Sequence, residues 1–199
     1  KKGKTALMYA ANDREIFKLL LEKVANLNEK DKKGKTALMY AVEKENYDNV
    51  KILLKAGTNV NEKDNNGKTA LIYAANNGNP ELLKLLLKKE VKLNEKDKDG
   101  KTALMYAAGK GHYDNVKILL KAGANVDEKD KYGKTAIMYA AENGHYDNVR
   151  VLLKKVSNVN EKDNSGKTAI DYAKTEEIKQ LLLKALEKQK ILKFNKKQR

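Results

Sequence analysis

The sequence predicts an all-helical (all-α) solenoid, a stack of helix–turn–helix repeats with projecting hairpin-like turns. The tetrapeptide Gly-Lys-Thr-Ala recurs six times, and we number the repeats one to six after its glycines: Gly3, Gly34, Gly67, Gly100, Gly133 and Gly166. From Gly34 onward these glycines are 33 residues apart, and a fixed period of this kind is typical of units that stack on their neighbours. With 41% hydrophobic and 35% charged residues, the chain is better suited to a thin continuous core than to a spherical one.

The fourth repeat shows the local signals most fully. Asp97 and Gly100 favour a turn, since aspartate starts turns and glycine tolerates a positive φ. Thr102 is a suitable N-cap for a first helix over residues 103–108. A second helix follows and ends at a left-handed Gly123. Neither helix is long enough to be stable alone in water, so the stacking of repeats must stabilise both.

This 33-residue unit resembles the ankyrin repeat, whose signature is T-P-L-H-x-A. The corresponding residues read Thr-Ala-Leu-Met-Tyr-Ala from Thr5, Thr36 and Thr102. The resemblance implies an ankyrin repeat domain over residues 1–186, followed by a basic C-terminal tail or helix extension over residues 187–199. It further implies a module that binds a partner protein through a concave groove and the turn tips. Because the sequence opens inside a repeat, we expect it to be part of a longer chain.

The interior of the stack departs from the family pattern. Methionine replaces the family's histidine, so we expect the stack to be held more by apolar burial than by a polar ladder; these residues are Met8, Met39, Met105 and Met138. In the sixth repeat Asp171 takes this place, as a C-terminal cap requires. Ile191, Leu192 and Phe194 are positioned to extend the last helix over the cap, and disorder from about residue 195 is the alternative.

The second helices alternate in how they end. Glycine stands at the end in repeats two and four, as Gly57 and Gly123. Val24, Glu90 and Val156 replace it in the odd-numbered repeats. A β-branched residue in a left-handed conformation is strained, so we expect these helices to end by another geometry.

Motifs that suggest chemistry have simpler explanations. The Gly-Lys-Thr strings lack the glycine that a phosphate loop needs five residues earlier, because glutamate stands there. A calcium loop would need a bidentate glutamate where Tyr106 stands. The chain has no cysteine and two serines, and no nucleophile–base pair is visible. We therefore expect no enzymatic activity, no cofactor and no metal site, and we interpret His112 and His145 as caps of the second helices.

One tyrosine recurs in the first helix of every repeat, and Tyr40, Tyr73, Tyr106 and Tyr139 are the interior copies. Each lies two residues after a core Leu or Ile, which turns it about 200° from the core face. In the family this direction borders the groove, and tyrosine is a frequent interface anchor. Packing between neighbouring repeats explains an invariant residue equally well, and both interpretations stay open.

Positions that vary between repeats are the better indication of specificity. At the turn tips they are Lys33, Asn65, Asn66, Lys98, Asp99, Lys131 and Tyr132. At the ends of the first helices they are Asn76, Asn77, Lys110, Glu142 and Asn143. The resemblance implies that these residues form the recognition surface, and drift at solvent-exposed positions is the alternative.

The net charge of +15 comes almost entirely from lysine. A protein partner should therefore present an acidic and apolar patch. Lysine-driven binding to nucleic acid or an anionic surface is an alternative function, which we expect to be weak and non-specific because arginine, the usual reader of phosphates and bases, is scarce. A second alternative is that the chain serves as a structural or regulatory segment of a larger protein. We expect a monomer, and no apolar run is long enough to span a membrane.

Overall fold

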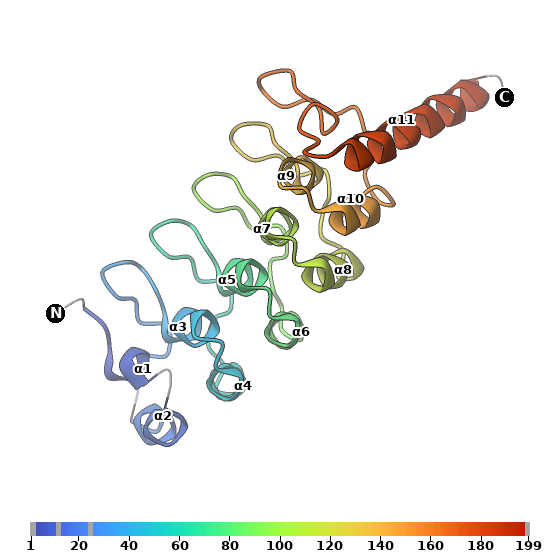
Figure 1. Ribbon diagram of the computed structural model, residues 1–199. Coiled ribbons are helices and arrows are strands. Elements are labelled where there is room, and N and C mark those ends of the chain that lie inside the picture. Colours follow the sequence, from blue (N-terminus) through green and yellow to red (C-terminus); the bar gives the residue numbers. More distant parts are fainter. Residues whose placement is uncertain (1–2, 11–12, 24–25, 198–199) are drawn as a thin grey trace.

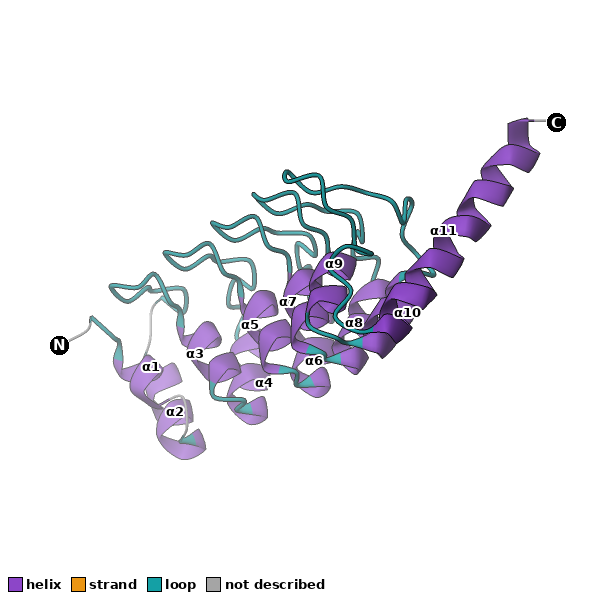
Figure 2. Cartoon of the chain, turned by 45° about the horizontal axis from the view of Figure 1, so that its top comes forward, coloured by secondary structure: helices purple, strands orange, loops and turns teal. Residues whose placement is uncertain are grey.

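In the computed structural model, which describes residues 3–10, 13–23 and 26–197 (side chains to residue 195), helices stack in pairs along one axis (Figure 1). The first helices are α1 (Ala6–Tyr9), α3 (Ala37–Glu43), α5 (Ala70–Asn77), α7 (Ala103–Lys110) and α9 (Ala136–Glu142). The second helices are α2 (Arg14–Leu21), α4 (Tyr47–Lys55), α6 (Pro80–Leu87), α8 (Tyr113–Lys121) and α10 (Tyr146–Leu152), and α11 (Glu176–Lys197) ends the stack. Long turns project in a row from one edge (Figure 2). The predicted all-helical solenoid is confirmed.

Threonine starts the first helices. The hydroxyl groups of Thr36, Thr69 and Thr102 accept hydrogen bonds from the backbone N–H three residues later, at 3.4, 3.3 and 3.4 Å. Each bond satisfies a donor that the first helical turn leaves unpaired. Helix α7 extends to Lys110, two residues beyond the predicted end, because the left-handed backbone of Gly111 then ends it.

The turns join one another edge to edge. Within the fourth turn, Oδ1 of Asp97 accepts hydrogen bonds from the backbone N–H groups of Asp99 and Lys101, both at 2.9 Å. Gly100 has a φ of 78°, and a Cβ there would lie 2.8 Å from the backbone nitrogen of Lys131. Backbone N–H groups donate to the preceding turn at 2.8–2.9 Å: Asn65 to Lys33, Lys98 to Asn66, Lys131 to Asp99 and Asn164 to Tyr132.

The predicted capping role of His112 and His145 is wrong. Each occupies the N-cap position of its helix, α8 or α10, but its side chain makes no cap hydrogen bond. Nε2 of His112 instead lies 2.9 Å from the carbonyl oxygen of Asn76, and Nε2 of His145 lies 3.1 Å from that of Gly109, each in the preceding repeat. A Cβ at Gly78 would lie 2.6 Å from the His112 ring. The rings therefore reach across the repeat interface because glycine leaves room for them there.

The sequence predicts a stack held more by apolar burial than by a polar ladder, and contacts of both kinds cross the interface between repeats. Met39, Met105 and Met138 are buried as predicted. However, Nδ2 of Asn115 donates to the carbonyl oxygens of Ala74 and Ala75 in the preceding repeat at 3.2 and 3.5 Å, and Nδ2 of Asn148 donates to that of Ala108 at 3.1 Å. Both asparagines are buried. Polar and apolar contacts together hold adjacent repeats in register.

The alternation at the ends of the second helices has the predicted consequence. Gly57 and Gly123 adopt φ values of 85° and 95°. Glu90 and Val156 do not have a positive φ, so their helices end without a left-handed residue. Val24 lies outside the described residues.

The sixth repeat closes the stack. Residues 169–172 form hydrogen-bonded turns instead of an α-helix. Asp171 is exposed, and its carboxylate accepts hydrogen bonds from the backbone N–H and the hydroxyl of Thr168, both at 2.7 Å. Helix α11 then packs against α10 and buries Ile178 and Leu182 completely. These contacts make residues 166–186 the cap of the array.

Beyond the cap, α11 continues to Lys197 and extends past the stack (Figure 2). Ile191, Leu192 and Phe194 are helical, but their side chains are 61%, 52% and 62% exposed. Contrary to the prediction, these side chains do not cover the cap, because at this point the helix has already passed the last repeat on which it could pack. No helix in the described part of the chain is sufficiently long and apolar to cross a membrane.

Candidate protein-binding groove

The recurrent tyrosines point from the first helices toward the projecting turns. The hydroxyl groups of Tyr40, Tyr73 and Tyr106 donate hydrogen bonds to the Oδ2 atoms of the turn aspartates of their own repeats, at 2.7, 2.7 and 2.6 Å. Tyr139 makes the equivalent bond to Asp130. We call this side of the first helices, together with the facing turns, the groove. Each tyrosine therefore ties a first helix to the turn that precedes it.

Lysines lie between successive tyrosine rings. Nζ of Lys101 lies 5.9 Å from the centre of the Tyr106 ring and 4.6 Å from that of Tyr139. Nζ of Lys35 lies 5.3 and 4.6 Å from the rings of Tyr40 and Tyr73. Cations over aromatic faces are attracted by the ring quadrupole. The tyrosines thus have a packing role between repeats, in agreement with one of the two interpretations from sequence.

This environment strongly favours neutral tyrosines. Burial raises the pKa of Tyr73, Tyr106 and Tyr139 far above that of a free phenol, and the hydrogen bond to the turn aspartate raises it further. Burial also raises the pKa of the Asp31 carboxyl, but hydrogen bonds from Tyr40 and from two backbone N–H groups outweigh this effect, and the net pKa is lowered. The groove therefore keeps its tyrosine phenols neutral at neutral pH, and it keeps the Asp31 carboxylate ionised.

Changing Tyr106 to Phe should lower the free energy of unfolding by about 1 kcal/mol, because the buried Asp97 carboxylate loses a hydrogen bond. Because the folded pKa of Tyr106 is raised, its stabilising contribution should be complete below the unfolded pKa of about 10 and should disappear as the pH rises further. Chemical denaturation as a function of pH measures both effects. Tyr47→Phe is the matched control, since Tyr47 is 42% exposed, and an equal loss in both variants would contradict this account.

Two hollows open along the groove. One, of about 250 Å³, lies between α7 and α9, and it is lined by Lys101, Met105, Tyr106, Gly109, Lys110, Tyr139 and Asn143. The other, of about 510 Å³, is lined by Tyr132, Lys134, Tyr139, Asp163, Asn164, Ser165 and Tyr172. The structure thus brings Tyr106, Tyr139, Lys110 and Asn143 together around the first hollow, and places Tyr132 at the second.

The other variable residues lie along the groove margins, and several already have partners within the chain. The tip residues Lys33, Asn65, Asn66, Lys98, Asp99 and Lys131 are exposed. Asp99 pairs with Lys131, and Nδ2 of Asn65 donates to the carbonyl oxygen of Lys32 at 2.9 Å. At the helix ends, Nδ2 of Asn77 donates to the carbonyl oxygen of Val42 at 3.4 Å, and Glu142 pairs with Lys134. Asn76 meets His112 through its backbone carbonyl oxygen only. These pairings leave fewer side chains free than the sequence suggests.

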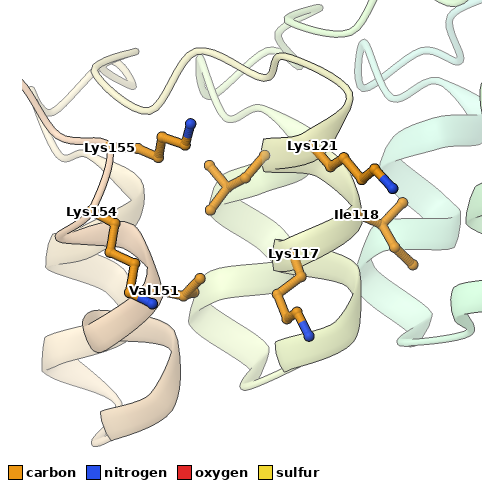
Figure 3. Close-up of a pocket in the computed structure, with 7 residues that line it drawn as sticks. Lys117, Ile118, Lys121, Val151, Lys154 and Lys155 are labelled. Atoms are coloured by element: carbon orange, nitrogen blue, oxygen red, sulfur yellow. The ribbon is translucent and has the colours of Figure 1, made fainter.

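A third hollow, of about 550 Å³, lies on the opposite side, between α8 and α10, and sequence reasoning missed it. Figure 3 shows Val151 pointing from α10 toward α8, with lysines around it. The hollow is lined by Lys117, Ile118, Leu120, Lys121, Val151, Lys154 and Lys155. The sequence does contain an indication of this hollow, because Val151 stands where α4, α6 and α8 carry the larger Ile52, Leu85 and Ile118.

Among the described residues, no cluster of three or more His, Cys, Asp or Glu side chains could hold a metal ion.

Comparisons with known proteins identify the repeats. The family described as ankyrin repeats (3 copies) matches residues 1–64 and 56–130, and that described as ankyrin repeats (many copies) matches residues 123–173. No curated protein matches the chain. Ankyrin repeats are generally modules of protein–protein interaction, and proteins built from them are typically non-enzymatic. The matched residues extend over most of the sequence, and the chain belongs to the ankyrin repeat family.

Proposed function

We propose that this chain binds a partner protein through the groove and the turn tips of repeats two to five. The observation that carries the proposal is the hollow between α7 and α9. There the invariant Tyr106 and Tyr139 lie beside Lys110 and Asn143, which vary between repeats. Invariant residues supply a rigid surface, and variable residues at its edge supply the specificity of recognition.

The chemistry of the groove indicates the kind of partner. Tyrosine rings offer large, rigid contact area, which is typical of the residues that dominate binding energy. The intervening lysines favour a partner surface of negative charge, which accelerates association and fixes orientation. A patch that combines apolar side chains with Asp or Glu meets both requirements.

A matched pair of double variants tests the proposed surface. Lys110→Ala with Tyr132→Ala removes two exposed groove residues, whereas Lys121→Ala with Tyr47→Ala removes the same residue types from the exposed sides of second helices. A partner isolated with the wild-type array should bind the groove variant about 30-fold more weakly, as expected when two interface anchors are lost. It should bind the control variant normally. The opposite ranking, measured by calorimetry, would place the interface on the second helices.

The high positive charge makes nucleic acid the competing ligand. If the proposal is correct, duplex DNA should bind weakly, without sequence preference, and should be released by about 200 mM salt, because such binding depends on counterion release. Fluorescence anisotropy over a salt series measures this dependence. Tight, sequence-selective binding that persists at this salt concentration would favour a nucleic-acid function instead.

A further inference from the structure

Two groove lysines pair with a glutamate of their own repeat. Nζ of Lys35 lies 2.8 Å from Oε1 of Glu43, and Nζ of Lys134 lies 2.9 Å from Oε1 of Glu142. In each pair the glutamate is eight residues after the lysine, at the end of the first helix. The lysine side chains are only 12% and 17% exposed. In repeats two and five, therefore, an internal carboxylate meets the lysine that lies between the tyrosine rings.

The fourth repeat keeps the lysine and lacks the carboxylate. Lys101 corresponds to Lys35, but the residue eight positions later is Gly109. Within the described residues, the Lys101 ammonium has no ion-pair or hydrogen-bond partner, and it contacts the rings of Tyr106 and Tyr139. The nearby Asp99 pairs with Lys131 and interacts with Lys101 only through weaker, longer-range attraction.

The missing side chain coincides with a cavity. Gly109 lines the hollow of about 250 Å³ between α7 and α9, together with Lys101 and the exposed Lys110. Tyr106 and Tyr139 form its aromatic walls, and Met105 also lines it. No acidic side chain lines this hollow. It thus combines two cations, apolar walls and open volume at a position that a glutamate occupies in two other repeats.

We propose that this hollow binds a carboxylate side chain, the Asp or Glu of a partner polypeptide, with Lys101 and Lys110 as its cationic contacts. The inserted carboxylate would take the place that Glu43 and Glu142 occupy in their repeats, and its aliphatic stem would lie between the tyrosine rings. This inference rests on the proposed protein-binding function and adds the chemical group that the centre of the groove recognises.

The test uses N-acetylglutamic acid α-amide, whose one carboxylate is that of its side chain, and its neutral counterpart N-acetylglutamine amide. In the wild-type array at physiological salt, the acidic probe should produce saturable changes in the backbone amide NMR signals of Gly109, Lys110 and Tyr139. The neutral probe should bind at least tenfold more weakly. Equal responses to the two probes, or changes spread evenly over the surface lysines, would overturn the proposal.

Gly109→Glu supplies the internal carboxylate and should abolish the response to the acidic probe. The variant should fold, because Gly109 is helical without a positive φ and a Cβ there comes no closer than 3.4 Å to Tyr139. Lys101→Met keeps the apolar stem, removes the charge and should lower probe affinity at least fivefold, whereas Lys121→Met on the exposed side of α8 should not. A response that persists in both Gly109→Glu and Lys101→Met would overturn the proposal.

This experiment separates the carboxylate site from the protein-binding function. A partner that requires Lys110 and Tyr132 but binds wild type and Gly109→Glu equally would leave the groove as the interface and refute the carboxylate site. A partner that ignores Lys110 and Tyr132 would refute the groove, whatever the probe does.

Discussion

Changing Asn115 to Asp should lower the free energy of unfolding by about 3 kcal/mol or more at neutral pH, because it buries a charge without a counter-ion. Asn115 is fully buried, and its Nδ2 donates to the carbonyl oxygen of Ala74 in the preceding repeat. A carboxylate at this position places negative charge against a carbonyl oxygen. The hydrogen bond becomes a repulsion in the middle of the stack.

The effect should depend on pH with a definite sign. Burial raises the folded pKa of an aspartate at position 115 above its unfolded value of about 4. The variant should therefore be closest to wild type in acid, where the protonated carboxyl can donate to the Ala74 carbonyl oxygen, and should lose stability as the pH rises. Urea unfolding of both proteins at each pH measures the difference. A constant difference between pH 4 and pH 8 would show that the side chain at position 115 is not buried between the repeats.

Changing Leu182 to Ala should lower the free energy of unfolding by about 3 kcal/mol, because it leaves a cavity where α11 packs on the stack. Stability in a solenoid is the sum of repeat terms and interfaces between neighbours. The loss should therefore be greatest in the fifth and sixth repeats, and amide hydrogen exchange should accelerate there first. Ile191→Ala is the matched control, because Ile191 belongs to the same helix and is 61% exposed.

The control should change stability by less than about 0.5 kcal/mol, as is usual for exposed positions. If Leu182→Ala and Ile191→Ala were equally destabilising, α11 would not act as a cap. Unchanged hydrogen exchange in the fifth repeat of Leu182→Ala would contradict the nearest-neighbour account of the stack. Light scattering provides a further comparison, since a loosened cap exposes apolar surface of the fifth repeat.

The sequence predicted the features of the fold that depend on local interactions. The period located the repeats, Thr102 marked the start of α7, and Gly123 marked the left-handed end of α8. Contacts across repeats were not predictable in this way, because they depend on the separation and register of neighbouring units. His112 illustrates this limit: its N-cap position suggested a cap, but its ring bonds to Asn76, 36 residues earlier.

Prediction of the candidate site had the same limit. The direction of the tyrosines followed from helix geometry, but their bonds to turn aspartates link residues nine apart across a turn of unknown shape. The absence of a glutamate at Gly109 is visible in an alignment of the repeats. The functional importance of this absence could be seen only in the structure, where Glu43 and Glu142 pair with groove lysines. The outer hollow at Val151 depends on one smaller side chain and on the separation of α8 and α10.

The most direct test of the central claim is backbone amide hydrogen exchange of the full chain, alone and bound to its partner. If the groove is the interface, exchange should slow in the turns around Gly100 and Gly133 and in α7 and α9. The amides of α8 and α10 should exchange at unchanged rates. The exceptions are amides that exchange only when the whole domain unfolds, because partner binding slows their exchange in every helix. Protection concentrated in α8 and α10, around the outer hollow, would contradict the account and assign partner binding to the opposite face.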